Sequence, residues 1–123
     1  MKIISALLCG FVPCFAVPPS APTDPWTARD YALESVVVAE FAVDWKQSSD
    51  IHERYWNYEC NPIMGRHPRQ STINQYFATT TLLHIFFADQ LSGKWRTAWQ
   101  ATWIGVEAGV IGNNYKIGIH LTF

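Results

Sequence analysis

Apolar side chains fill a long stretch near the start of the chain and predict a helix that is covered on nearly every face. The stretch runs over residues 31–45, where apolar residues occupy positions all around a helical wheel. Thr27 precedes it, and Asp30 follows three residues later, as expected of an N-cap with an acidic first turn. After residue 45 the pattern turns amphipathic, and Asn61-Pro62 is expected to stop the helix.

A loop over about residues 61–70 separates this helix from a second one. The second helix has an apolar core between residues 76 and 88. Ser71 or Thr72 is expected to cap its start, because short polar side chains accept bonds from the first free amides of a helix. Gly93 is expected to end it in the left-handed position that often follows a helix.

A third helix is predicted from about Lys94 to Ile111. Gly112-Asn113-Asn114 should break it, because these residue types favour turns. Residues 115–123 alternate in part between apolar and polar side chains, which predicts a strand-like, extended tail.

The first residues have the features of a secretory signal. Lys2 is the only charge before Asp24, an apolar run follows, and small residues at 14 and 16 fit a cut after Ala16. The expected organisation is therefore a signal peptide over 1–16, a Pro-rich tether over 17–26 and a helical domain over 27–123. A cleaved signal places the protein in the bacterial cell envelope.

Composition favours a lipid-facing or heavily buried protein. Charged residues make up 15% and aromatic residues another 15% of the chain, whereas soluble domains carry roughly 25% charged residues. The net charge of −1 offers no electrostatic basis for binding nucleic acid. We therefore predict a mainly α protein, a three-helix membrane-type bundle with a short extended C-terminal tail.

Two acids complicate this prediction. Glu34 and Glu40 lie inside the first apolar stretch, and a charge in mid-membrane costs at least about 2.5–3.5 kcal/mol unless it faces the protein interior. A soluble periplasmic helical domain therefore stays open as an alternative. If the protein lies in the inner membrane, a cleaved signal places the mature N-terminus outside. The first loop then faces the cytoplasm with Arg54, Arg66 and Arg69, which agrees with the enrichment of basic residues on that side.

The segment around the first loop carries the most distinctive motif. Asp44 comes late in the first helix, and Glu59, Asn61, Pro62 and Gly65 form an E-x-N-P-x-x-G turn. On these residues the chain resembles a group of small, uncharacterised bacterial and prophage-encoded membrane proteins, over roughly residues 36–123. The resemblance implies a membrane location and a phage-derived origin, and it brings no activity with it.

The same residues have a physical interpretation of their own. Asn61 before a proline can bond its own turn, and Gly65 can take a positive φ. With Asp44 and Glu59 accepting backbone bonds, the motif is interpreted as a structural clamp between two helices. A metal site is the sharper alternative, although the spacing of Cys60 and His67 matches no standard ligand pattern.

Three further polar side chains, those of Glu40, His84 and Glu107, are expected to be buried. His84 lies on an apolar helix and is expected to bond a neighbouring polar group. Glu107 needs a partner if it is buried, and either Glu40 or Asp44 could share a proton with it, or His84 could pair with it. Gly105 and Gly109 lie on one face of the third helix and predict close helix packing.

The leading functional prediction is a structural or interaction protein of the envelope membrane that modifies the host envelope if it is phage-derived. Its partners would be membrane lipid and either another protein or a second copy of the chain, with no catalytic set, metal or cofactor. The alternative from another class is a metal- or acid-dependent membrane enzyme centred on Asp44, Glu59, His67 and Glu107.

Overall fold

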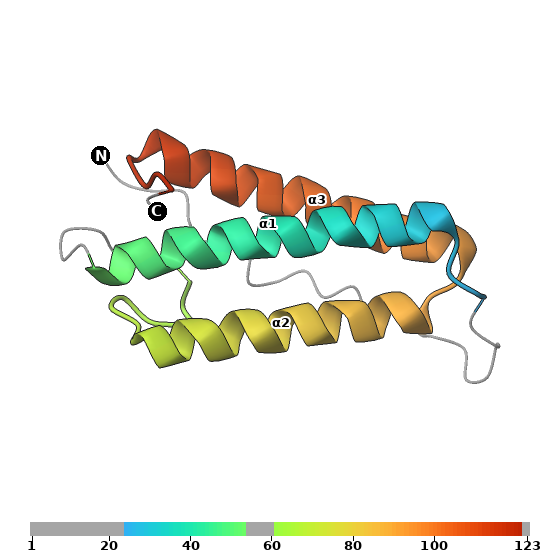
Figure 1. Cartoon of the computed structure of the whole chain (residues 1–123), viewed down its shortest axis with the longest axis horizontal. Helices are drawn as coiled ribbons and strands as arrows, with labels where there is room; N and C mark the ends of the chain where they lie inside the picture. The colour runs from blue at the N-terminus through green and yellow to red at the C-terminus, as the bar shows by residue number, and fades with distance from the viewer. Residues whose placement is uncertain (1–23, 54–60, 122–123) are drawn as a thin grey trace.

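The computed structural model describes residues 24–53 and 61–121, which form a bundle of three helices (Figure 1). Helix α1 spans Ala28–Glu53, α2 spans Gln70–Gln90 and α3 spans Gly93–Lys116. Helices α1 and α3 run in the same direction, and α2 runs antiparallel to both (Figure 1). The described residues contain no strand, so the predicted mainly α class is confirmed. The expected signal peptide and most of the expected tether lie outside the described residues.

The start of α1 is fixed by reciprocal bonds between Thr27 and Asp30. The Asp30 amide donates to Thr27 Oγ1 at 3.3 Å, while the Thr27 amide and hydroxyl each donate to Asp30 Oδ2 at 2.8 Å. This arrangement satisfies two backbone amides that have no partner inside the helix. The predicted N-cap at Thr27 is therefore confirmed.

The boundaries of α2 differ from the prediction at both ends. The helix begins at Gln70, and the extended Arg69 caps it without a side-chain bond. The Arg69 carbonyl already accepts from the amides of Thr72 and Ile73, so Ser71 and Thr72 lie inside the helix and the predicted caps are wrong. Gly93 has a φ of 49° but is the first residue of α3. It does not end α2, which stops at Gln90 with Leu91 as its C-cap.

Helix α3 continues past the predicted break at residues 112–114. The Asn114 side chain donates to Asp44 Oδ1 at 3.1 Å and to Gln47 Oε1 at 3.0 Å, both on α1. These bonds across the bundle favour the helical position of a residue type that otherwise prefers turns. The chain turns only at Ile117–Gly118, so the strand-like prediction for residues 115–118 is wrong. Residues 122–123 lie outside the described part.

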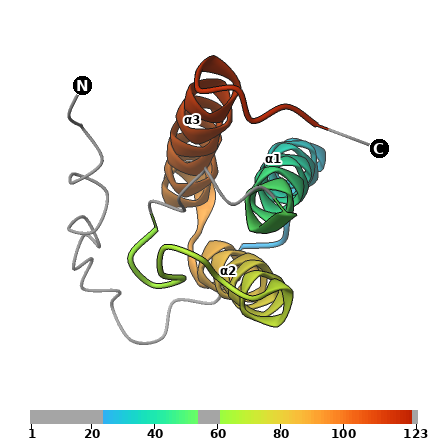
Figure 2. The ribbon, with the colours of Figure 1, turned by 90° about the vertical axis from the view of Figure 1, so that its left-hand side faces the viewer.

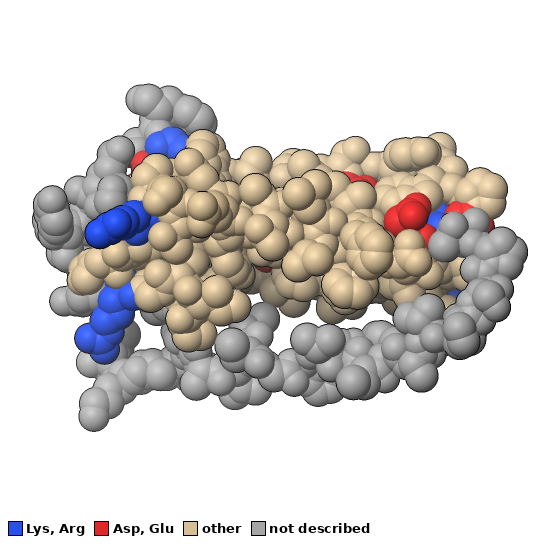
Figure 3. All heavy atoms as spheres, turned by 90° about the horizontal axis from the view of Figure 1, so that it is seen from below, with Lys and Arg blue, Asp and Glu red and all other residues tan. Residues whose placement is uncertain are grey.

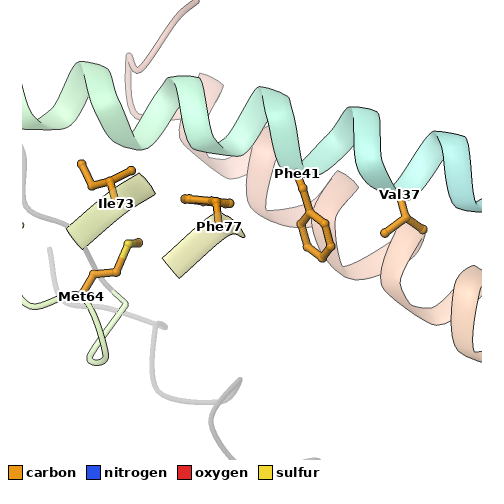
Figure 4. Packing of buried hydrophobic residues seen from close by; sticks show 5 residues of the cluster. All are labelled: Val37, Phe41, Met64, Ile73 and Phe77. Atoms are coloured by element: carbon orange, nitrogen blue, oxygen red, sulfur yellow. The ribbon is translucent and has the colours of Figure 1, made fainter. Parts of the chain in front are cut away.

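Helix α1 packs against both other helices, which contact each other less (Figure 2). A small apolar cluster fills the space beside α1. Its buried members come from α1, α2 and the loop before α2 (Figure 4): Val37, Phe41, Met64, Ile73 and Phe77. Trp103 of α3 packs edge-on against Phe41, with ring centroids 5.8 Å apart.

Hydropathy along the helices is modest. Within the described residues, none of the three helices combines the length and the apolar character that mark a segment able to cross a membrane.

Candidate functional site in the polar interior

Polar side chains occupy much of the interior of the bundle, and large apolar side chains occupy its outside. Ten polar or charged residues of the described part are buried, against eight hydrophobic ones. The buried polar set is Asp30, Glu34, Gln47, Ser48, Ser49, Asp50, His84, Arg96, Gln100 and Glu107. The exposed set includes Leu82, Leu83, Ile85, Phe86 and Phe87 on α2, with Val36, Trp45 and Trp95 on the other helices. Soluble proteins rarely bury charged side chains to this extent.

In α1 and α3, buried residues lie at intervals of three, four or seven along one face, and several of them are polar. In α1, Asp30 and Glu34 precede Val37 and Phe41 on one buried face. In α3, Arg96, Gln100 and Glu107 share the inward face. This spacing places side chains along the seam where helices meet. The polar groups therefore face one another.

Arg96 is held at the end of the bundle where α1 begins. It is 1% exposed, and its guanidinium donates to three acceptors. These are the Ala88 carbonyl at 3.0 Å, Asp30 Oδ2 at 3.3 Å and the Asp24 carbonyl at 2.7 Å. Trp26 lies over the same guanidinium, with its ring centroid 5.1 Å from Cζ. A planar group with five donors suits such a buried junction.

One helical turn further along α1 and α3, a second polar group joins all three helices. It consists of Glu34, His84 and Gln100. His84 Nδ1 lies 2.8 Å from Glu34 Oε1, and the Gln100 amide donates to Glu34 Oε2 at 3.0 Å. The His84 ring stacks on Trp99 at 5.3 Å, and Trp99 Nε1 donates to the His84 carbonyl. His84 is therefore a core residue bonded to a polar neighbour, as the sequence predicts. Its partner is Glu34 and not Glu107.

Glu107 lies further along α3 and is 6% exposed. Burial disfavours its charged form, and the negative charges of Asp44 and Glu40 on α1 add to that effect. The negative charges of Glu107 and Asp44 also act on Tyr76 of α2. Tyr76 is hydrogen-bonded to the side chains of Asn61 and Thr80. The sequence offered Glu40, Asp44 or His84 as the partner of Glu107, and in the structure the charges of both Glu40 and Asp44 act on it from α1.

Amide and hydroxyl groups continue the polar interior toward the end of α1. Gln47 is fully buried and receives a hydrogen bond from Asn114. Lys46 pairs with Asp50 one turn later, with Nζ 2.7 Å from Oδ1. Gln70 of α2 donates to Ser49 Oγ at 3.0 Å, which ties the start of α2 to α1.

The motif in the first loop forms a tight turn. Asn61 Oδ1 accepts from the Ile63 amide at 3.0 Å, and the Asn61 carbonyl accepts from Met64 and Gly65. Gly65 has a φ of 79°. The local turn is therefore as predicted around the exposed Pro62. Glu59 lies outside the described residues, so the clamp itself stays a prediction.

The other predicted positions lie on the surface. Gly105 and Gly109 are exposed, and a Cβ added at either would meet nothing within 4 Å. They do not pack against α1 or α2, because the inward face of α3 carries Arg96, Gln100 and Glu107. His67 is exposed in the loop. The described residues contain no group of three side chains arranged to hold a metal ion.

Exposed charges gather at the two ends of the bundle. In the described ranges, Asp24, Arg29, Asp89 and Lys94 lie where α1 and α3 begin, and Arg66, Arg69 and Lys116 lie at the opposite end. Figure 3 shows one face with charged atoms at both ends and a mainly uncharged middle. The charges therefore flank a mainly uncharged central belt on this face.

Sequence reasoning did not identify Arg96 and Gln100 as interior residues, and it treated Asp30 only as a capping residue. A signal for them exists: Arg96, Gln100, Trp103 and Glu107 follow a four-three-four spacing. That spacing matches an inward seam, but polar residues on such a seam are usually interpreted as a solvent-facing stripe.

Comparison with known proteins gives no family assignment. No protein-family model, no curated protein and no solved structure matches this chain.

Proposed function

We propose that this chain is a membrane-embedded protein of the bacterial cell envelope, of structural or interaction type. Its helices would turn their apolar sides to lipid and their polar sides to one another. The observation that supports this proposal is the inverted distribution of side chains, with Arg96 and Glu107 inside and Leu82 and Phe86 outside. In water, that distribution would expose apolar surface and bury charge, and both cost free energy.

Helix length supports the same proposal. At 1.5 Å per residue, helices of 26, 21 and 24 residues are about 39, 32 and 36 Å long. The hydrocarbon core of a bilayer is about 30 Å thick. Mean hydropathy averages over the whole circumference of a helix, so side chains that face the other helices lower it. Lipid would contact only the outward faces, where the large apolar residues lie.

The distribution of charge supports an orientation. The end with the first loop exposes Arg66, Arg69 and Lys116, whereas the other end balances Arg29 and Lys94 with two aspartates. Basic residues are enriched on the cytoplasmic side of membrane proteins. We therefore propose that the loop faces the cytoplasm and that the start of α1 faces outward. The resemblance to prophage-encoded proteins extends the proposal, by analogy alone, to modification of a host envelope.

The sharpest test places a charge on the outward face at mid-helix. Leu82 is 68% exposed and lies near the middle of α2, and arginine at a helix centre costs about 2.5–3.5 kcal/mol on insertion. Leu82→Arg should therefore lower membrane insertion roughly a hundredfold, measured as the share of protein that stays in the membrane pellet after a carbonate wash.

Gln90→Arg is the matched control, because Gln90 is exposed at the last position of the same helix. It should leave the carbonate-resistant share unchanged. If the bundle were surrounded by water, Leu82→Arg should have little effect, because substitutions at exposed positions change the free energy of unfolding by no more than about 0.5 kcal/mol. Equal behaviour of the two variants, or release of the unaltered protein by carbonate, would refute the membrane proposal.

A further inference from the structure

The group of acids around Glu107 lies near the middle of the bundle. Hydrogen bonds between α1 and α3 join residues 66 to 70 positions apart, as in Gln100 to Glu34 and Asn114 to Asp44. The same range of offsets places Glu107 level with residues 37–41 of α1, which include Glu40. Glu40 lies near the centre of α1, which runs from residue 28 to 53. These carboxyl groups are therefore about as far from both ends as the bundle allows.

Two oxygen atoms in this group are buried and have no hydrogen-bond partner in the described structure. They are Oε2 of Glu107 and Oε2 of Glu40. An ionised carboxylate only accepts hydrogen bonds, whereas a protonated carboxyl group also donates one. A proton held in the group would supply the hydrogen that these two oxygens lack.

The described residues that face Glu107 supply no positive charge. The negative charges of Asp44 and Glu40 on α1 act on Glu107, and the charge of Glu107 in turn acts on Tyr76 of α2. The buried basic groups of the described part pair elsewhere: Arg96 with Asp30 and His84 with Glu34. Lys46 is likewise paired with Asp50. Neighbouring carboxylates without a cation cannot all ionise at little cost, because like charges repel strongly where water is excluded.

We infer that the group formed by Glu40, Asp44 and Glu107 is a proton-binding site, in which Glu107 holds a proton at neutral pH and shares it with a carboxyl group of α1. The ligand is the proton itself, and the site makes the packing of α1 against α3 depend on its occupancy. The inference does not require a membrane, because the protein's own helices bury Glu107.

Infrared spectroscopy of the purified full chain in mild detergent tests this directly. At neutral pH the spectrum should contain the carbonyl stretch of a protonated carboxylic acid, and the band should shift in deuterium oxide. Glu107→Gln should remove the band, because the amide keeps the shape and loses the acid. Asp89→Asn is the control, since Asp89 is exposed at the end of α2, and it should leave the band in place.

Thermal unfolding at increasing pH provides a second readout, which needs no variant at Glu107. Removing the proton leaves adjacent negative charges inside the bundle, so the midpoint temperature should fall as the pH rises. The double variant Glu40→Gln with Asp44→Asn removes the repulsion and should show a smaller fall. A spectrum without a band that depends on Glu107, or an equal fall in both proteins, would overturn the inference. Stabilisation by sodium ions at constant pH would overturn it too, in favour of a cation site.

Discussion

Arg96 offers the most demanding test of the polar interior. Replacing it with methionine keeps most of the side-chain volume and removes the charge and every donor. The Ala88 and Asp24 carbonyls and the Asp30 carboxylate would each lose a bond that a charged group now donates. Breaking a buried ion pair from one side costs about 3–5 kcal/mol. The free energy of unfolding should fall by that amount, measured by denaturant titration with helical circular dichroism in one fixed detergent.

A double-mutant cycle separates the ion pair from the rest of the effect. Asp30→Asn removes the charge that faces Arg96, so adding it to Arg96→Met should cost less than the sum of the two single losses. Lys94→Met is the matched control, because Lys94 is exposed two residues earlier in α3. The control should stay within about 0.5 kcal/mol of the unaltered protein. The reasoning fails if Arg96→Met is as harmless as this control, or if the two single effects add fully.

Two further predictions concern the loop and the topology. Gly65→Ala should destabilise the protein by about 1–2 kcal/mol in the same titration, because alanine is strained at a φ of 79° although the space around it is open. Gly109→Ala, at an open position of regular helix, should not destabilise it, and an equal loss at both positions would contradict the strain argument. A reporter that fluoresces only in the cytoplasm should fluoresce when fused after residue 123, because the C-terminal segment lies at the same end as the first loop (Figure 1). A dark but inserted fusion would reverse the proposed orientation.

The existence of the three helices follows from short-range patterns, and their ends do so only in part. Thr27 and Asp30 form reciprocal hydrogen bonds within one turn, so the start of α1 can be predicted from four residues of sequence. The end of α3 cannot be predicted from neighbouring residues in this way. Asn114 should favour a turn, yet it lies within α3 and bonds Asp44 and Gln47, which are 70 and 67 positions earlier in the chain.

The sequence allowed the residues of the candidate site to be predicted better than the contacts between them. His84, Glu40 and Glu107 are recognisable as polar groups within apolar helices. Which acid each group meets depends on how far one helix is shifted along another. A shift of one helical turn, about 5.4 Å, would bring a different residue of α1 opposite Glu107. Gly105 and Gly109 illustrate the same limit, because their spacing fixes a common face but not what that face contacts.

The sequence by itself determined that the chain forms three helices with acids and a histidine set among apolar residues, because capping and periodicity act over a few neighbouring positions. Only the tertiary structure decided that these polar groups face one another and that the large apolar side chains of α2 face outward. It also joined Glu34 to His84, separated by 50 positions, and Arg96 to Asp30. Such pairs depend on the register and rotation of whole helices, and packing of the complete bundle fixes both.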